Sequence, residues 1–182
     1  MGKQFSSIEA AHREFIERQH IFFHATAAAE GRINLSVRDR TSLRVLDPSS
    51  VIYLDLTGSG NETAAHLLAD GRLTFLFCAF EGAPMILRLY GRGRTFARSS
   101  PEYGDLLASH FEGAEPPGAR QMVHLAVDSV QTSCGMNVPF FDYAGERDQL
   151  KRWAEVKGET ALEEYRRQKN AVSIDGLPTG LF

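Results

Sequence analysis

The sequence is poor in cysteine: only Cys78 and Cys134 occur among its 182 residues. Neither belongs to a C-x-x-C pair, so the chain carries no zinc or dithiol motif, and two buried free thiols are expected instead of a disulfide. His20 and His24 share one side of a predicted strand. No third histidine, cysteine or carboxylate stands at a suitable spacing, so we expect no metal site.

Long hydrophobic runs are also missing. The longest apolar run, residues 73–80, is far too short to span a bilayer. The beginning "MGKQFSSIEAAHREF" lacks the apolar segment of a secretory signal. Gly2 and Ser6 match the N-myristoylation pattern, but that pattern is short and unspecific. We therefore expect a cytoplasmic protein that has no membrane partner.

Charge of one sign is not in excess, because the formal net charge is only −3. A nucleic-acid-binding chain needs a concentrated positive face, so no nucleic-acid partner is expected. With 43% hydrophobic and 24% charged residues, the composition is that of an ordinary globular domain. The length predicts a single domain over residues 1–182, in which about residues 145–182 form a helical C-terminal extension.

Alternation of apolar and polar residues predicts that most of the chain forms strands. Ile33, Leu35 and Val37 alternate as the inward side chains of a half-buried strand should. The strand-like segments are "HIFFHATAA", "RINLSVR", "SLRVL", "VIYLDL", "RLTFLFCAF", "MILRLYGRG" and "RQMVHLAVDSVQ". Because "SLRVL" continues the strand-like pattern of the segment before it, we count these segments as about six strands in hairpin succession, a pattern that most often closes into an antiparallel barrel.

Helices are expected between and after these strands. They cover about residues 7–19, two turns that end at Asp70–Gly71, a segment from about residue 101 to Gly113, and residues 146–170 with a break at Gly158. Ser6 and Glu9 have the spacing of a capping box for the first helix. In the last helix, Leu150, Trp153 and Val156 fall on one face, which we expect to be a packing face.

The stretch "LTGSGNETAAHL", residues 56–67, allows two interpretations. Ser59 and Glu62 can form a capping box, and Asn61 is an equally good helix cap. Alternatively, the unpaired N–H groups at the helix start can bind an anion, with the hydroxyls of Ser59 and Thr63 as further donors. Local chemistry leaves this choice open.

Three longer segments carry a family resemblance. "RVLDPSSVIYLDLTGSGNETAAHL", "GRLTFLFCAFEGAP" and "ILRLYGRGR" resemble the pyridoxamine 5′-phosphate oxidase-like family of flavin-binding split barrels. "SCGMNVPFFDY" and "RRQKNAVSIDGLP" resemble the branch that continues with a "CG…VP" motif and a helical extension. The resemblance covers about residues 8–178, and the block from Arg44 to Arg94 is its most specific part.

The resemblance implies a mainly β chain with helices (α+β), folded as a six-stranded antiparallel split β-barrel. It also implies a homodimer with FMN at the subunit interface. The flavin phosphate would be held by Arg44 and by the loop and helix after the next strand, which decides the local choice in favour of the phosphate. The cofactor-binding residues that it implies are Asn34, Leu35, Ser36, Arg38, Arg44, Val45, Leu46, Ser59, Asn61, Thr63 and Arg92.

Two departures from the family pattern concern the cofactor. Thr63 stands where many members place a phosphate-binding lysine, and a hydroxyl cannot neutralise charge. The branch usually has Ser-Pro-Lys-Gly where this chain has residues 36–39, so Arg38 is the candidate to replace the lysine charge. Because some relatives use a deazaflavin, the choice between FMN and a deazaflavin coenzyme stays open.

No catalytic side chain can be assigned, since the sequence contains no G-x-S-x-G elbow and no paired catalytic carboxylates. This suits a flavoenzyme, in which the cofactor carries the redox chemistry. We expect an FMN-dependent oxidoreductase that acts on a small molecule other than pyridoxamine phosphate. The alternatives are a deazaflavin-dependent oxidoreductase, a flavin-binding or sensing protein without turnover, and a haem-binding barrel, for which no axial ligand is evident.

Overall fold

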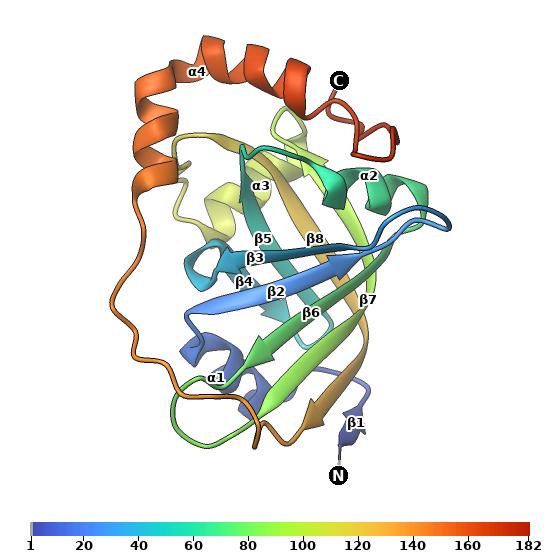
Figure 1. Ribbon diagram of the computed structural model, residues 1–182, viewed down its shortest axis with the longest axis vertical. Helices are drawn as coiled ribbons and strands as arrows, with labels where there is room; N and C mark the ends of the chain where they lie inside the picture. Colours follow the sequence, from blue (N-terminus) through green and yellow to red (C-terminus); the bar gives the residue numbers. More distant parts are fainter. Residues whose placement is uncertain (1) are drawn as a thin grey trace.

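A computed structural model describes residues 2–182, which are built around one antiparallel sheet (Figure 1). Its strands follow the order β3-β2-β6-β7-β8-β5-β4, and β1 pairs with β8 outside this path. The strands are β1 (Lys3–Phe5), β2 (Ile21–Thr26), β3 (Asn34–Asp39), β4 (Leu43–Asp47), β5 (Ser50–Leu56), β6 (Arg72–Cys78), β7 (Ile86–Ala97) and β8 (Ala119–Ser133).

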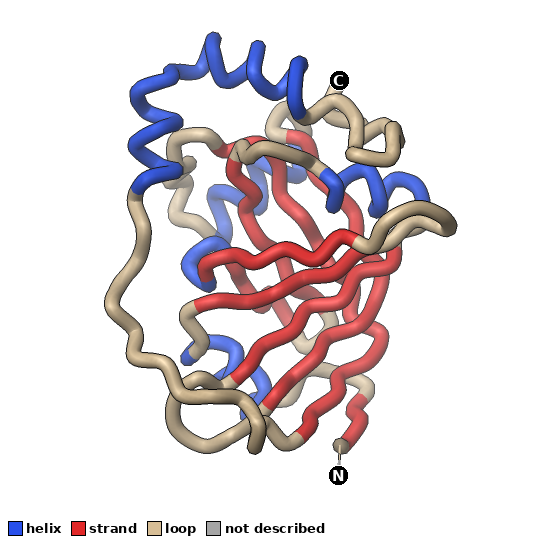
Figure 2. Tube along the Cα trace, viewed as in Figure 1, coloured by secondary structure: helices blue, strands red, loops and turns tan. Residues whose placement is uncertain are grey.

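The sheet curls into an open barrel. Its two end strands, β3 and β4, are consecutive in the chain and are joined by the short 3-10 helix η1 (Arg40–Ser42). No pairing among the described residues links β3 to β4, so the barrel is split at this point (Figure 2). The expected class, a mainly antiparallel split barrel with helices, is confirmed.

The strand count differs slightly from the six expected. All the strand-like segments of the sequence form strands, and β1 adds a further one. Three residues are too short for an alternation signal, and β1 is defined only by its distant partner, since Lys3 lies opposite Thr132 of β8. The long β8 pairs with β7 on one side and with β5 and β1 on the other.

Aromatic side chains fill the barrel. Phe22, Tyr53, Phe75 and Phe77 are completely buried, and the Phe22 and Phe75 ring centroids are 5.3 Å apart. Burial of each such side chain stabilises the fold by about 1.5–3 kcal/mol, so this cluster is a main source of barrel stability.

At the edge strand β3, the apolar side chains were expected to point into the barrel, but they point outward. Ile33, Leu35 and Val37 are 75%, 71% and 50% exposed, and the polar side chains between them turn inward. The Asn34 amide donates to the hydroxyl of Thr26 on the neighbouring strand. The inward face of β3 borders a polar region instead of the aromatic core, which is why its apolar residues point outward.

The helices are α1 (Ala10–Arg18), α2 (Glu62–Ala69), α3 (Pro101–His110) and α4 (Gln149–Lys169). The expected capping box of Ser6 and Glu9 is wrong. Glu9 is itself the N-cap of α1, and its N–H donates to Nδ1 of His12 at 3.1 Å. Helix α3 begins after Ser100, whose hydroxyl accepts from the N–H of Tyr103.

Helix α4 crosses one end of the barrel (Figure 1). The expected break at Gly158 is confirmed, because this residue has a left-handed φ of 71° and separates two helical segments. The expected packing face is wrong: Leu150 and Val156 are 45% and 89% exposed. The buried residues of α4 are Ala154, Leu162 and Arg166, of which Ala154 lies on the segment before the kink. Trp153 packs edge-on against Tyr165 across the kink, with ring centroids 5.3 Å apart.

Residues 134–148, which we call the connecting segment, lead from β8 to α4 without helix or strand (Figure 2). Cys134 in this segment is exposed and Cys78 is half-buried, so the expectation of two buried thiols is wrong. No helix within residues 2–182 is long and apolar enough to cross a membrane.

A close backbone approach occurs where the pairing of β7 and β8 shifts between Tyr90 and Gly91. A Cβ on Gly91 would lie 1.9 Å from the Ala126 carbonyl oxygen. We expect Gly91→Ala to lower the free energy of unfolding by at least about 1–3 kcal/mol, measured by urea denaturation.

Gly104 in α3 is the matched control, since a Cβ there meets nothing within 4 Å. Gly104→Ala should stabilise the protein by roughly 0.5–1 kcal/mol through helix propensity. Equal denaturation midpoints for Gly91→Ala and the wild type would contradict the close approach.

Candidate functional site

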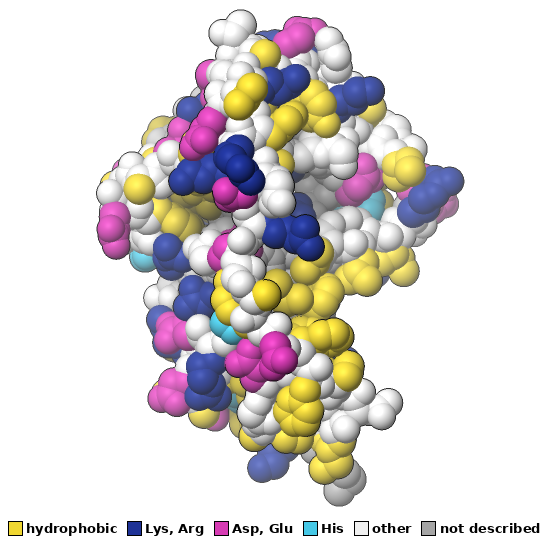
Figure 3. All heavy atoms as spheres, turned by 60° about the vertical axis from the view of Figure 1, so that its left-hand side comes forward, with side chains coloured by type: hydrophobic (Ala, Val, Ile, Leu, Met, Phe, Trp, Pro, Cys, Tyr) yellow, Lys and Arg dark blue, Asp and Glu magenta, His cyan; other side chains and the backbone are white. Residues whose placement is uncertain are grey.

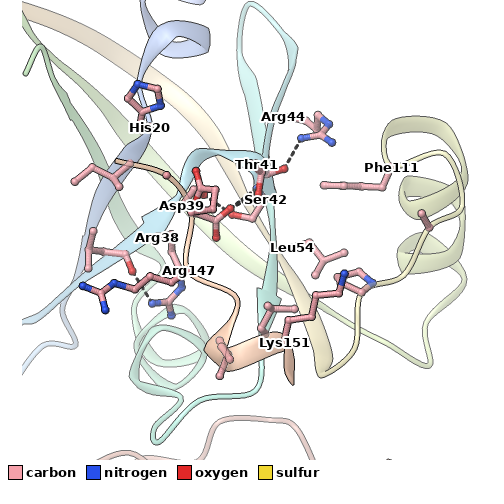
Figure 4. Close-up of a pocket in the computed structure, with 18 of the residues that line it drawn as sticks. His20, Arg38, Asp39, Thr41, Ser42, Arg44, Leu54, Phe111, Arg147 and Lys151 are labelled. Atoms are coloured by element: carbon pink, nitrogen blue, oxygen red, sulfur yellow. Dashed lines mark hydrogen bonds between the residues drawn. The ribbon is translucent and has the colours of Figure 1, made fainter. Parts of the chain in front are cut away.

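Two adjoining cavities lie at the open end of the barrel. The first has a volume of about 840 Å³ and is enclosed by β3, η1, β4, the turn after α3, the connecting segment and the start of α4 (Figure 4). Lys and Arg side chains surround the hollowed region on this side of the molecule (Figure 3). The charged residues that line the first cavity are Arg38, Asp39, Arg44, Glu112, Glu146, Arg147 and Lys151.

The second cavity, of about 400 Å³, is more polar. It is lined by the loop of residues 58–61, the first residues of α2, the inward side chains of β3, and Arg120. Arg38, Leu54 and Leu56 line both cavities, so the two spaces adjoin at these side chains.

A buried ionic group lies against the second cavity. The Asp55 carboxylate accepts from Nη2 of Arg120 at 2.6 Å and from Nη2 of Arg38 at 3.3 Å, and Asp55 is only 1% exposed. Burial alone would raise the pKa of the Asp55 carboxyl, but Arg120 and Arg38 outweigh it and lower that pKa. Asp55 is therefore ionised and neutralises one of the two guanidinium charges.

No sequence motif marks this ionic group. Asp55 is a single acid within the apolar segment "VIYLDL", and Arg120 opens the last long strand. A charge inside an apolar strand is a signal of a buried partner, because an unpaired buried charge is too costly. The identity of the partner, 65 positions away, cannot be read from the pattern.

The amide of Gln121 connects Asp55 to Asn61. Its Nε2 donates to Oδ2 of Asp55 at 2.9 Å and to Oδ1 of Asn61 at 2.8 Å. Because an ionised carboxylate only accepts, the Gln121 nitrogen has to face Asp55, and this in turn fixes the orientation of the Asn61 amide. Asn61 Nδ2 is left without a partner although Asn61 is only 2% exposed.

Such an unpaired donor is unusual. Among residues 2–182, the buried side-chain atoms that lack a hydrogen bond are Asn61 Nδ2, His24 Nδ1 and Arg40 Nε. A buried donor without a partner costs about 1–3 kcal/mol, so its retention in the wall of a polar cavity indicates a place for an acceptor.

The capping interpretation of this loop is not what the structure shows. Asn61 occupies the N-cap position of α2 but makes no side-chain cap bond. The Glu62 carboxylate turns away from the helix start and accepts from the N–H of Ile174 at 3.0 Å. Neither Ser59 nor Asn61 therefore satisfies the first N–H groups of α2 in the way a capping box would.

Thr63 faces the barrel interior. Its hydroxyl oxygen accepts from Asn34 Nδ2 at 3.1 Å and lies 2.8 Å from Nε2 of His24. The pKa of His24 is lowered to about 3, mainly by burial and also by Arg38, so this imidazole is neutral. It also lies 3.3 Å from the Tyr53 hydroxyl, whose pKa is raised by burial.

The family resemblance implies that Arg44 and the loop before α2 hold the flavin phosphate together, but the two lie on different cavities. Arg44 lines the first cavity, whereas Ser59, Asn61 and Thr63 line the second. Its Nε donates to the His110 carbonyl at 2.9 Å and its Nη1 to the Thr41 carbonyl at 2.7 Å (Figure 4). Burial and the nearby Arg40 lower the pKa of Arg44.

The other expected residues are spread over the barrel. Ser36 and Arg38 line the second cavity together with Asn34. Val45 packs against the main core and Leu46 against the smaller cluster beside α3, and Leu35 faces outward. Arg92 is 65% exposed, donates to the Asp70 carbonyl at 2.9 Å, and is not among the residues that line either cavity.

His20, just before β2, and His24 within it do not share a site. His24 is buried beside Thr63, whereas His20 stacks on Tyr143 of the connecting segment with ring centroids 3.7 Å apart. The described part of the chain contains no group of three residues suited to hold a metal ion.

The sheet topology defines the class of mainly antiparallel split β-barrels, here with two adjoining cavities at the open end. Within this class, the family model described as pyridoxamine 5′-phosphate oxidase matches residues 8–134. The pyridoxamine 5′-phosphate oxidase family protein ustO of Aspergillus flavus is 36% identical over 192 residues, which cover 96% of this chain and 76% of that protein. The chain therefore belongs to the pyridoxamine 5′-phosphate oxidase family.

Solved structures agree on the fold. A variant of HupZ from Group A Streptococcus superposes with a TM-score of 0.57 at 19% identity, over 69% of this chain and 99% of that one. A candidate pyridoxamine 5′-phosphate oxidase from Lactobacillus delbrueckii gives a TM-score of 0.53 at 20% identity, over 69% and 94% of the two chains. At these identities the likeness concerns the fold alone.

The neutral state of His24 predicts a pH dependence of stability. The unfolded chain takes up a proton on His24 near pH 6.5, whereas the folded protein does so only near pH 3. The free energy of unfolding should therefore fall as the pH is lowered from 6.5 toward 3, by up to about 1.4 kcal/mol per pH unit from this group.

Urea denaturation of the wild type and of His24→Gln at pH 7 and pH 5 measures this contribution. His124 adds to the same trend, because burial and Arg94 lower its pKa, and it is present in both proteins. The stability gap between the wild type and His24→Gln should narrow at pH 5. A constant gap would contradict a neutral His24.

Proposed function

We propose that this protein is an FMN-dependent oxidoreductase that acts on a small molecule, with the flavin bound in the two adjoining cavities. The observation that carries the proposal is the unpaired, buried Nδ2 of Asn61 in the wall of the second cavity. Family membership supports it, because flavin binding is what the sequence resemblance implies.

The residues of the second cavity fit a phosphate. Asn61 Nδ2, the first N–H groups of α2 and the Ser59 hydroxyl are donors, and a helix N-terminus favours an anion. Arg38 and Arg120 line the same cavity and are both paired with the Asp55 carboxylate. Because Asp39 and Glu62 line it as well, the hydrogen-bond donors, and no net positive charge, are what suit an anionic group.

The residues of the first cavity fit a flat aromatic ring. Its volume of about 840 Å³ lies in the range of small-molecule sites, and Leu54, Leu56 and Phe111 supply apolar surface. Bound there, FMN would supply hydride or electron transfer. The chain's own residues hold and orient the cofactor and exclude water from it. His24 is held neutral and buried, and no side chain is assigned as an acid or base.

The absorption spectrum of the purified protein, followed by mass spectrometry of the ligand released by heat, tests this proposal. Flavin bands and a released mass of FMN are expected. A deazaflavin spectrum would instead select the deazaflavin-dependent alternative. A colourless protein that takes up no FMN at micromolar concentration would overturn the proposal.

The phosphate position is tested by Asn61→Asp, which keeps the acceptor for Gln121 and replaces the unpaired donor by a carboxylate oxygen. Loss of a charge-assisted hydrogen bond costs about 1.5–3 kcal/mol, so FMN affinity should fall roughly ten- to a hundredfold. Riboflavin, which has no phosphate, should lose little affinity. Fluorescence titration with both flavins measures this; equal losses would contradict the phosphate position.

Arg44→Gln is the corresponding variant in the first cavity. If the phosphate lies at Asn61, this variant should lower the affinities for FMN and for riboflavin to a similar extent. A loss confined to FMN would place the phosphate beside Arg44, as the family pattern alone suggests.

We further propose that the protein is a homodimer with the flavin at the subunit interface. Strand β3 lies at the end of the sheet, so one of its edges is unpaired. The apolar side chains of Ile33, Leu35 and Val37, at and just before this strand, are exposed. An apolar edge strand of this kind usually has a partner. The cytoplasmic location expected from the sequence stays a prediction.

Leu35→Glu should convert the dimer to a monomer, because it places a charge in the middle of this apolar edge. Light scattering measures the mass of both proteins. Val156→Glu is the matched control, since Val156 is an equally exposed apolar residue on α4 and should leave the mass unchanged. A wild type that is monomeric while binding FMN tightly would contradict the dimer.

A further inference from the structure

The end of α4 is fastened to the loop of residues 57–61, which we call the ligand loop. Asn170, the C-cap of α4, is completely buried. Its Nδ2 donates to the Gly58 carbonyl at 3.0 Å, and its Oδ1 accepts from Nη1 of Arg120 at 2.9 Å. Figure 1 shows the end of α4 next to the loop that precedes α2.

Two arginines extend this contact along the ligand loop. Nη1 of Arg120 also donates to the Gly60 carbonyl at 2.9 Å. Nε of Arg166 donates to the Thr57 hydroxyl at 2.8 Å, and the Arg166 side chain is 8% exposed. Together with the bond from Gln121 to Asn61, four of the five residues of the ligand loop are thus held by buried side chains, and two of these side chains, Arg166 and Asn170, belong to the end of α4.

These contacts decide which way the peptide groups of the ligand loop point. In a planar trans peptide, the carbonyl of one residue and the N–H of the next point in opposite directions. With the Gly58 and Gly60 carbonyls directed at Asn170 and Arg120, the N–H groups of Ser59 and Asn61 point away from them.

The ligand loop has little conformational preference of its own. Gly58 and Gly60 lack side chains, and a Cβ on Gly58 would meet nothing within 4 Å. Glycine is the most flexible residue, so a loop with two of them needs external contacts to hold one conformation. Here those contacts come partly from β8, through Arg120 and Gln121, and partly from the helical extension, through Asn170 and Arg166.

We propose that Asn170 and Arg166 are positioning residues of the C-terminal extension that hold the ligand loop in its anion-binding conformation. The proposal rests on the proposed flavin site and names what keeps that site in order. The family model ends at residue 134, so both residues lie outside the part that it matches.

The test is Asn170→Ala, which removes the bonds to Gly58 and Arg120 together. Amide hydrogen exchange of peptides covering residues 57–63, measured without ligand, should become at least about tenfold faster, whereas exchange in β6 and β7 should not change. The ratio of FMN to riboflavin affinity should fall roughly tenfold, since loss of one or two hydrogen bonds costs about 1.4 kcal/mol or more.

Leu162→Ala is the matched control, because Leu162 is a buried residue of α4 that takes no part in these bonds. It should lower the melting temperature without changing the affinity ratio. Asn170→Asp keeps the acceptor for Arg120 but loses the donor to Gly58, so it should give a smaller change in the same direction. It also keeps the test valid if Asn170→Ala does not fold.

Unchanged exchange in the ligand loop of the folded Asn170 variants would overturn the proposal. Faster exchange with an unchanged affinity ratio would also overturn it, because the loop conformation would then not matter for the phosphate. A wild type that binds no FMN would refute the flavin site instead, and the exchange measurement would still decide whether α4 holds the loop.

Discussion

The buried Asp55 carboxylate is the constraint on which the candidate site depends. A fully buried carboxylate is tolerated only when charged and polar partners surround it. Here Arg120, Arg38 and Gln121 fill that role, and each of them reaches a further part of the site. Removal of this one charge would leave two guanidinium groups facing each other across the second cavity.

Through Gln121, the same carboxylate fixes the orientation of the Asn61 amide and so leaves a donor free. Through Arg120, it connects to the backbone of the ligand loop and to the end of α4. In the sheet, Asp55 of β5 is paired with Gln121 of β8, and Arg120 lies beside it at a shift of the register, so the barrel itself holds this group in place.

The fold could be predicted from the sequence wherever the signal was local. The apolar, strand-forming character of "VIYLDL" or "RLTFLFCAF" is visible within a few residues, and the glycine break at Gly158 is equally local. Which face of β3 is buried depends on what packs against it, so the prediction for Ile33 and Val37 was wrong. The prediction of the packing face of α4 was wrong for the same reason, because distant segments decide which side of the helix is covered.

The candidate site was harder to predict than the fold. The family resemblance marked Asn61 and Arg44, but the structure places them on different cavities. Asp55, Arg120 and Asn170 carry no motif, and their roles follow from contacts across 50 to 112 positions of the chain. Such contacts are invisible to reasoning that works within a window of neighbouring residues.

The bond between Gly58 and Asn170 joins residues that are 112 positions apart. During synthesis the N-terminal part of a chain leaves the ribosome first and starts to fold before the rest exists. The ligand loop, although it comes early in the sequence, therefore has to wait for the synthesis of α4 before it can form its bonds to Arg166 and Asn170. A product interrupted before this helix would lack these bonds even where its strands had paired.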